Sequence, residues 1–224
     1  MSDQFIVPQS ITEEVTRFLR RQLLLRKKYP PGSFIRENEV AEELNVSRSP
    51  VREALKVLES YGIIKTLPRR GALVLRFSKE ELDEIYDVRV LLETKVYTEI
   101  VKNSLMTQEH EAYLGDCIRE YREIRRIFEK KGLEEGQLAF FELERRFHFY
   151  IHNISGLTWT SELLRKAYSR VFQCLIHNVM PEDLDSLADF HQEILHNLHE
   201  GNLEALCGQR VESYMNGKAY ENGE

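Results

Sequence analysis

The chain has 224 residues, of which 42% are hydrophobic and 10% aromatic, a composition that builds a packed core and argues against a disordered chain. No apolar run approaches the length of a membrane span, and the first ten residues lack the pattern of a secretion signal. The three cysteines are scattered, which favours buried thiols over a disulfide scaffold or a zinc cluster. We therefore expect a cytoplasmic protein without a membrane partner.

The formal net charge of −6 is distributed unevenly along the chain. Residues 1–77 hold 14 Lys and Arg against 9 Asp and Glu, whereas the remainder holds 17 against 28. A basic first third joined to an acidic remainder predicts that only the first part contacts phosphate. Ordinary surface variation would also produce such a split, so the motifs have to decide between the two interpretations.

The first third combines helical periodicity with strand signals. Ser10-Ile11-Thr12-Glu13 is a capping-box pattern that opens a helix, and Pro30-Pro31-Gly32 cannot continue it. A hairpin tip is expected at Pro68-Arg69-Arg70-Gly71. In chain order, the patterns predict three helices and two short strands, over residues 10–29, 37–44, 47–61, 63–67 and 72–75. Three helices followed by a two-stranded wing form a winged helix-turn-helix.

The third of these helices carries the most informative motif. Arg48 and Arg52 lie four residues apart and share one helical face. Ser47 or Ser49 can cap the helix, and its first turn tolerates Pro50. The opposite face is apolar and expected to be buried, through Val51, Ala54, Leu55 and Leu58. A short helix with one apolar side and a basic leading end fits the major groove of DNA.

From Ser78 onward the pattern is almost entirely helical. Six helices are predicted, over about residues 78–103, 107–131, 134–154, 158–178, 183–200 and 202–219. The chain is thus mainly α, with a winged helix-turn-helix domain over residues 1–77 and an all-α antiparallel helical bundle over residues 78–224. In the first long helix, Ile85, Val88 and Leu92 are expected to face the core, with Arg89 beside that stripe.

Two sets of residues carry family patterns. The first set spans about 65 positions and comprises Pro31-Gly32, Val40-Ala41, Val46–Leu55, Leu58, Gly62, Pro68–Gly71 and Val74. On these residues the first domain closely resembles the GntR family of bacterial transcription regulators. The second set is sparser and comprises Arg89 with Glu93, Phe147-His148, Ile151, Ser155-Gly156 and His191 with Ile194. On these residues the helical domain looks like the FadR-type effector domain, usually called FCD.

The resemblance implies a ligand-responsive transcription regulator, in this family more often a repressor. It implies a homodimer on a pseudo-palindromic operator, with a small organic acid as effector. One recognition helix reads only a few base pairs, so two symmetric copies are needed for useful specificity. Two alternatives stay open: a metal-dependent, hydrolase-like activity in the helical domain, or a DNA-binding dimer that has no effector. We do not expect an enzyme, because no nucleophile–base constellation accompanies the candidate metal ligands.

The expected DNA contacts lie on the third helix and the wing. Arg48 and Arg52 are expected at base edges or adjacent phosphates, because an arginine binds guanine O6 and N7 in bidentate fashion. The remaining candidates are Ser47 and Ser49 at phosphates, Arg69, Arg70 and Gly71 at the minor groove, and, more weakly, Asn38 and Lys56. The alternative is a solvated basic face with a capping serine.

The resemblance also implies a metal site in the helical domain, since many such domains hold a divalent metal with an Asp and three His. His148 matches the first His, His191 the second, and Glu144 stands where the Asp is usual. The third His would fall near Ser213. Zinc, nickel or manganese would fit such ligands, with water or the effector completing the shell. Possible substitutes for the missing ligand are His152 and His196. The alternative is that these are satisfied polar groups in a bundle core.

Arg89 has two interpretations. The family resemblance implies that it contacts the effector, together with His148 and His191. An arginine facing a bundle cavity requires a carboxylate, which an organic acid supplies. The alternative is an ion pair on the helix surface with Glu93, four residues further on.

Overall fold

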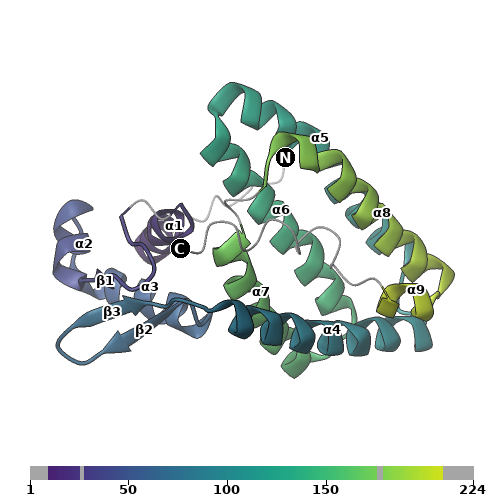
Figure 1. The fold of residues 1–224 in the computed structure, drawn as a ribbon, viewed down its shortest axis with the longest axis horizontal. Coiled ribbons are helices and arrows are strands. Elements are labelled where there is room, and N and C mark those ends of the chain that lie inside the picture. The colour runs from purple at the N-terminus through teal and green to yellow at the C-terminus, as the bar shows by residue number, and fades with distance from the viewer. Residues whose placement is uncertain (1–9, 26–27, 176–178, 209–224) are drawn as a thin grey trace, which may run out of the picture. The chain divides into compact units, whose positions relative to one another are not determined.

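The computed structural model describes residues 10–25, 28–175 and 179–208 of the chain. The chain divides into two compact units, residues 1–76 and residues 77–224. Figure 1 shows helices in both units and a small sheet in the first. None of the helices within the described ranges combines the length and the hydropathy that crossing a membrane requires.

The first unit contains the predicted three helices and a wing. Ser10 and Glu13 form the expected capping box, since the Ser10 hydroxyl accepts from the Glu13 N–H at 3.2 Å and the Glu13 carboxylate accepts from the Ser10 N–H at 3.0 Å. In chain order the elements are α1 (Ile11–Leu24), β1 (Phe34–Ile35), α2 (Glu37–Glu43), α3 (Arg48–Ser60), β2 (Ile64–Leu67) and β3 (Gly71–Val74).

The sheet has a third strand that the sequence analysis did not predict. The order is β1-β3-β2, with both pairs antiparallel, and Phe34 lies opposite Leu73 while Ile35 lies opposite Ala72. β1 has two residues, so it is too short to show the alternation by which a strand is recognised. Its pairing with β3 ties the wing to the segment that leads into α2.

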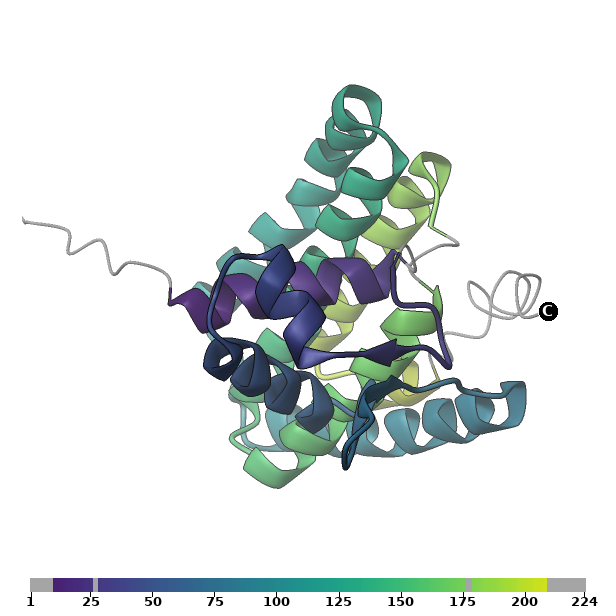
Figure 2. The same ribbon diagram turned by 90° about the vertical axis from the view of Figure 1, so that its left-hand side faces the viewer.

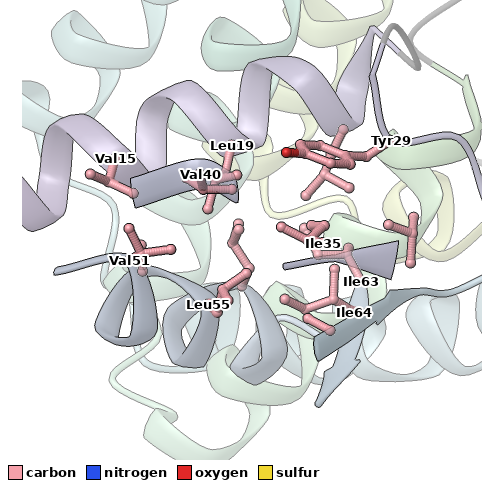
Figure 3. Packing of buried hydrophobic residues seen from close by; sticks show 14 of the residues in the cluster. Val15, Leu19, Tyr29, Ile35, Val40, Val51, Leu55, Ile63 and Ile64 are labelled. Atoms are coloured by element: carbon pink, nitrogen blue, oxygen red, sulfur yellow. The ribbon is translucent and has the colours of Figure 1, made fainter. Parts of the chain in front are cut away.

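The core of this unit is a cluster of buried apolar side chains from α1, α2, α3 and the sheet, part of which Figure 3 shows. Val51, Ala54, Leu55 and Leu58 of α3 are all buried, as predicted. Val40 of α2 is also fully buried in this cluster. Because packed interiors leave little room for movement, this burial holds α2 and α3 in one relative position.

The second unit is a bundle of helices whose predicted ends are correct to within a few residues. Its elements are α4 (Lys79–Lys102), α5 (Gln108–Lys131), α6 (Leu133–Ile154), α7 (Thr158–Leu175), a 3-10 turn (Pro181–Asp183), α8 (Leu184–Glu200) and α9 (Leu203–Gly208). The second capping box, Ser78 with Glu81, is present at the start of α4. The predictions that residues 176–178 and 209–219 are helical lie outside the described residues.

The helices of this unit pack side by side. α5 packs along α6, α8 packs along α5, and α4 packs against α7 (Figures 1 and 2). Several polar side chains are buried among them, including Arg89, Glu93, Glu144, His148, His152 and His191. Buried polar groups of this kind are costly unless they are paired, so their arrangement indicates a site.

The expected buried face of α4 was wrong. Val88 is 44% exposed, and Ile85 and Leu92 are half-buried, whereas Arg89 and Glu93 are buried. Consecutive residues such as Val88 and Arg89 lie on neighbouring faces of a helix. The prediction chose the face with the most apolar side chains, and that face is not the buried one. Arg89 and Glu93 carry opposite charges one turn apart, so burying them together does not leave an uncompensated charge.

Candidate functional sites

The exposed face of α3 carries the expected basic and hydroxyl groups. Ser47 is the residue that precedes the helix, although its side chain makes no capping hydrogen bond, and Ser49 is exposed. Arg48, Arg52 and Lys56 are also exposed, with more than half of each side chain accessible. A helix N-terminus with free hydroxyls and cations on one face is suited to phosphate and base edges.

A carboxylate that the sequence analysis did not consider lies against both arginines. Glu37, the first residue of α2, accepts from Arg52 Nη2 at 2.9 Å and from Arg52 Nε at 3.2 Å. It also accepts from Arg48 Nη2 at 3.5 Å. These hydrogen bonds lower the pKa of Glu37, Arg52 being the main cause. The sequence offered no signal for this contact, because Glu37 and Arg52 are fifteen residues apart on different helices.

The wing places Arg69 and Arg70 at an exposed tip, with Asn38 exposed on α2. Arg69 has a left-handed backbone, with φ of 63°, which a non-glycine residue rarely adopts. Gly71 has φ of 94°, and a Cβ atom built on it would lie 2.4 Å from the carbonyl oxygen of Ile35. The close approach that Gly71 permits is therefore to β1 of the same chain.

Hydrogen bonds to a carboxylate also fix the wing to α3. Glu59, near the end of α3, accepts from the Thr66 N–H at 2.7 Å and from the Thr66 hydroxyl at 2.8 Å. Thr66 lies in β2, so α3 and the hairpin are joined by these two hydrogen bonds as well as by the core.

In the second unit, the structure brings Glu144, His148 and His191 together. His148 Nε2 lies 3.5 Å from Glu144 Oε2, His191 Nε2 lies 3.2 Å from Glu144 Oε1, and the two Nε2 atoms are 3.3 Å apart. All three side chains are buried. Donor atoms on one face of a tetrahedral zinc site are about 3.3–3.6 Å apart, given zinc–ligand bonds of about 2.0–2.2 Å. The residues present therefore fit a divalent metal in number, type and spacing.

The ring of His191 has a defined orientation. Its Nδ1 lies 2.6 Å from the carbonyl oxygen of Leu187, which accepts a hydrogen bond from it. In the neutral ring this leaves the lone pair of Nε2 directed at Glu144 and His148, which is how a metal-binding histidine is usually oriented. Burial lowers the pKa of His191, but the Glu144 carboxylate outweighs burial and raises it above the ordinary value.

Tyr121 of α5 completes this cluster, and the sequence analysis missed it. Its hydroxyl donates to Glu144 and lies 3.1 Å from His191 Nε2. Burial, reinforced by Glu144, raises the pKa of Tyr121 well above the ordinary value, so the hydroxyl stays protonated. From its spacing in an amphipathic helix, such a tyrosine is expected to be an ordinary core residue. Only its neighbours in the folded structure show that its hydroxyl belongs to the polar cluster.

Arg89 and Glu93 form a second buried group beside the first. Arg89 Nε lies 3.4 Å from Glu93 Oε2, and the side chains are 5% and 9% exposed, so the alternative of a surface pair was wrong. The Arg89 guanidinium lies over the rings of Tyr86 and Tyr168, at 5.1 Å from each centroid. Its Nε and Nη2 atoms have no hydrogen-bond partner. Such buried unpaired donors are costly and indicate a place for an acceptor.

Glu93 connects the two groups. It accepts from the Tyr168 hydroxyl, and its Oε1 lies 3.8 Å from His152 Nε2 and 4.0 Å from His148 Nδ1. Burial by itself would raise the pKa of Glu93, but Arg89 chiefly lowers it to about 2. The His148 ring thus lies between two carboxylates, Glu144 on one side and Glu93 on the other.

The proposed substitutes for the missing ligand fall in different places. His152 is buried, but it lies beside Glu93, with its ring centroid 6.4 Å from that of His148. His196 is exposed on α8 and does not join the cluster. Ser213, where the family pattern would have its third histidine, lies outside the described residues.

These features define a class of protein. An exposed basic helix with an adjoining wing is the DNA-reading element of winged helix-turn-helix proteins, and the helical unit adds a buried polar site. The sequence model described as "Bacterial regulatory proteins, gntR family" matches residues 12–74, and the model of the FCD domain matches residues 84–208. The chain belongs to the GntR family of bacterial transcription regulators, with an FCD domain as its second unit.

Known proteins agree with this assignment. The chain is 54% identical over 71 residues to the gluconate operon transcriptional repressor of Bacillus subtilis, and the match covers 32% of this chain but only 29% of that repressor. It is 30% identical over 179 residues to the transcriptional repressor RspR of Escherichia coli, covering 79% and 74% of the two chains. The solved structure of E. coli McbR/YncC superposes with a TM-score of 0.68 at 25% identity, covering 89% of this chain and 91% of that one. The family consists of transcription regulators rather than enzymes, so the hydrolase-like alternative is set aside.

Proposed function

We propose that this protein binds a pseudo-palindromic operator as a homodimer and represses transcription in the cytoplasm until a small organic acid binds its helical unit. The observation that supports DNA reading most directly is the exposed face of α3, where Arg48 and Arg52 lie on the side opposite the buried core. Arg69 and Arg70 at the wing tip contact the phosphate backbone of the DNA beside the minor groove. Ser47, Ser49, Asn38 and Lys56 are secondary contacts on the same exposed surfaces.

We further propose that the cluster of Glu144, His148 and His191 holds a divalent metal such as zinc, nickel or manganese. One ligand atom from each of the three residues lies within 4.8 Å of the other two, so a small adjustment of the side chains would bring all three onto one metal ion. A metal bound there would supply a positive centre that attracts a carboxylate. Glu144 and the two histidines would hold this centre, and the Tyr121 hydroxyl would fix the orientation of Glu144.

The effector in this proposal is a small carboxylate. Arg89 offers two buried N–H donors without partners, and its guanidinium fork matches a carboxylate. Glu93 compensates the buried charge of the arginine and holds its guanidinium in place until the ligand arrives. Effector binding favours one arrangement of the dimer, and the spacing of the two recognition helices then no longer fits the operator. A coupling of about 1–3 kcal/mol would change operator affinity roughly five-fold to 150-fold.

Metal content tests the first half of this proposal. We expect about one metal ion per chain in purified protein, lost in His148→Ala and in His191→Ala. In the metal-stripped protein, zinc or nickel at a hundred times its dissociation constant should raise the melting temperature by about 5–10 °C. His196→Ala is the matched control, because this histidine is exposed on the same helix as His191. A protein without metal, whose melting temperature does not respond to added ions, would contradict the metal site.

Operator binding tests the second half. The full-length protein is used to select duplexes from a randomised pool, and small mono- and dicarboxylates are then titrated against the selected duplex. We expect at least one carboxylate to change the affinity. The double variant Arg89→Met with Glu93→Leu, which leaves neither buried charge unpaired, should abolish that response while leaving operator binding intact. If no carboxylate changes the affinity, the domain serves only to form the dimer, which was the remaining alternative.

A further inference from the structure

The carboxylate of Glu37 lies at the joint between the two helices of the helix-turn-helix. It belongs to the first residue of α2, whereas both arginines that it contacts belong to α3. A carboxylate in the first turn of a helix is favoured by the helix dipole, so its position is stabilised before any arginine is considered. The side chain is 23% exposed, compared with 52% for Arg52 and 60% for Arg48.

The contact with Arg52 uses one edge of the guanidinium. Nε and Nη2 both donate to Glu37, one to each carboxylate oxygen, which fixes the plane of the group as well as its position. The end-on edge, formed by Nη1 and the second hydrogen of Nη2, is left for another acceptor. That edge is able to donate two parallel hydrogen bonds to guanine O6 and N7.

The two helices that carry this contact, α2 and α3, are held rigidly relative to each other. Val40 of α2 and Val51 of α3 are both fully buried. Figure 3 shows their side chains in the same apolar cluster. Because these neighbours hold α2 and α3 together, Glu37 cannot drift relative to Arg52 without disturbing the core. An arginine on an exposed helix face otherwise samples many rotamers, and ordering it on DNA costs conformational entropy.

We infer that Glu37 is a positioning residue for DNA reading, which holds the Arg52 guanidinium in the plane needed to recognise a guanine and restrains Arg48 beside it. This inference rests on the proposed role of α3 as the DNA-reading helix. Glu37 also offsets the charge of the arginines, so that contact with any phosphate is less favourable than contact with the correct base. Its effect is on specificity more than on the strength of binding.

The test compares two variants of the full-length protein, Glu37→Gln and Glu39→Gln. Both remove one negative charge from α2, but Glu39 pairs only at 3.5 Å with Arg36, and both of those side chains are exposed. The wild-type protein first selects a duplex from a randomised pool. Arg52→Ala then identifies the G·C pair that Arg52 reads, as the position at which base preference is lost. Affinities are measured for the selected duplex and for one changed at that pair.

We expect Glu37→Gln to reduce the affinity ratio of these two duplexes about tenfold, while Glu39→Gln leaves it unchanged. The melting temperature of each variant should stay within about 4 °C of that of the wild type. A merely structural role for Glu37 would lower both affinities equally, and that result, or an unchanged ratio, would overturn the inference. If the wild type selects no sequence at all, the proposed function falls and the inference falls with it. If the wild type does select a sequence but Glu37→Gln leaves the affinity ratio unaltered, the proposed function stands and only the inference about Glu37 is overturned.

Discussion

Arg89 and Glu93 form an ion pair that α4 buries one turn apart, with 3.4 Å between Nε and Oε2. Burying two charges is unfavourable unless they compensate each other and find further hydrogen bonds. Glu93 finds one in the Tyr168 hydroxyl, whereas two of the Arg89 nitrogen atoms find none. The pair is therefore more than a stabilising contact, since it holds unused donors ready in the interior of the helical unit.

Breaking this pair should be strongly destabilising. We expect Glu93→Gln to lower the free energy of unfolding by about 3–5 kcal/mol, because it leaves the Arg89 charge buried without a counter-charge. The double variant Arg89→Met with Glu93→Leu should recover most of this loss. Urea unfolding of the metal-stripped protein measures both. Glu142→Gln, which breaks an exposed pair with Arg145, is the control and should change stability by less than about 1 kcal/mol. A Glu93→Gln loss no larger than that of the control would show that the pair is not buried in solution.

Gly71 should tolerate no side chain. Gly71→Ala combines a left-handed backbone with a Cβ atom 2.4 Å from the Ile35 carbonyl oxygen, so β1 would have to separate from β3. We expect a loss of more than about 2 kcal/mol in the free energy of unfolding. Gly32→Ala measures the cost of the left-handed backbone alone. Gly32 has a similar φ of 88°, but the atom nearest to a Cβ built on it would be an ordinary 3.7 Å away. Equal losses in the two variants would contradict the importance of the β1 contact.

Replacing Arg69 and replacing Arg70 with glycine should affect the stability of the protein differently but should weaken DNA binding equally. Arg69→Gly relieves the left-handed strain at φ of 63° and should stabilise the protein by up to about 1 kcal/mol, whereas Arg70→Gly brings no such gain. Each variant should reduce the slope of log affinity against log salt by about one, as expected for the loss of one phosphate contact. Thermal unfolding and salt titrations measure the two effects. Unchanged salt slopes in both variants would remove the wing from the DNA interface.

The contact between Glu37 and Arg52 should make stability depend on pH. The pKa of folded Glu37 lies below its ordinary value of 4.5, so the unfolded chain takes up this proton more readily than the folded chain. The stabilisation is therefore fully present above pH 4.5 and is lost as the pH falls below it. We expect Glu37→Gln to be less stable than the wild type by about 0.2–1 kcal/mol at pH 7, with the difference shrinking toward pH 3.5. A difference that grows on acidification would contradict this sign. Glu39→Gln serves again as the control.

Local signals in the sequence determined much of this protein. The capping boxes at Ser10 and Ser78 and the apolar stripe of α3 predicted where helices begin and which side of α3 is buried. Such signals involve residues only three or four positions apart, so they can be recognised in the sequence before the fold is known. The order of helices and hairpin strands in the first unit, the run of helices in the second and the spacing of Glu144 and His148 on one helical face all follow from signals of this range.

Only the tertiary structure decided which distant groups meet. Tyr121 and His191 are 70 residues apart, and Glu37 and Arg52 are fifteen residues apart on two helices, yet each pair is in hydrogen-bond contact. The burial of Arg89 in place of Val88 likewise depends on which face of α4 meets α7 and α6. Helix packing sets these contacts through the fit of whole side-chain surfaces, a property of the assembled core that no short stretch of sequence contains.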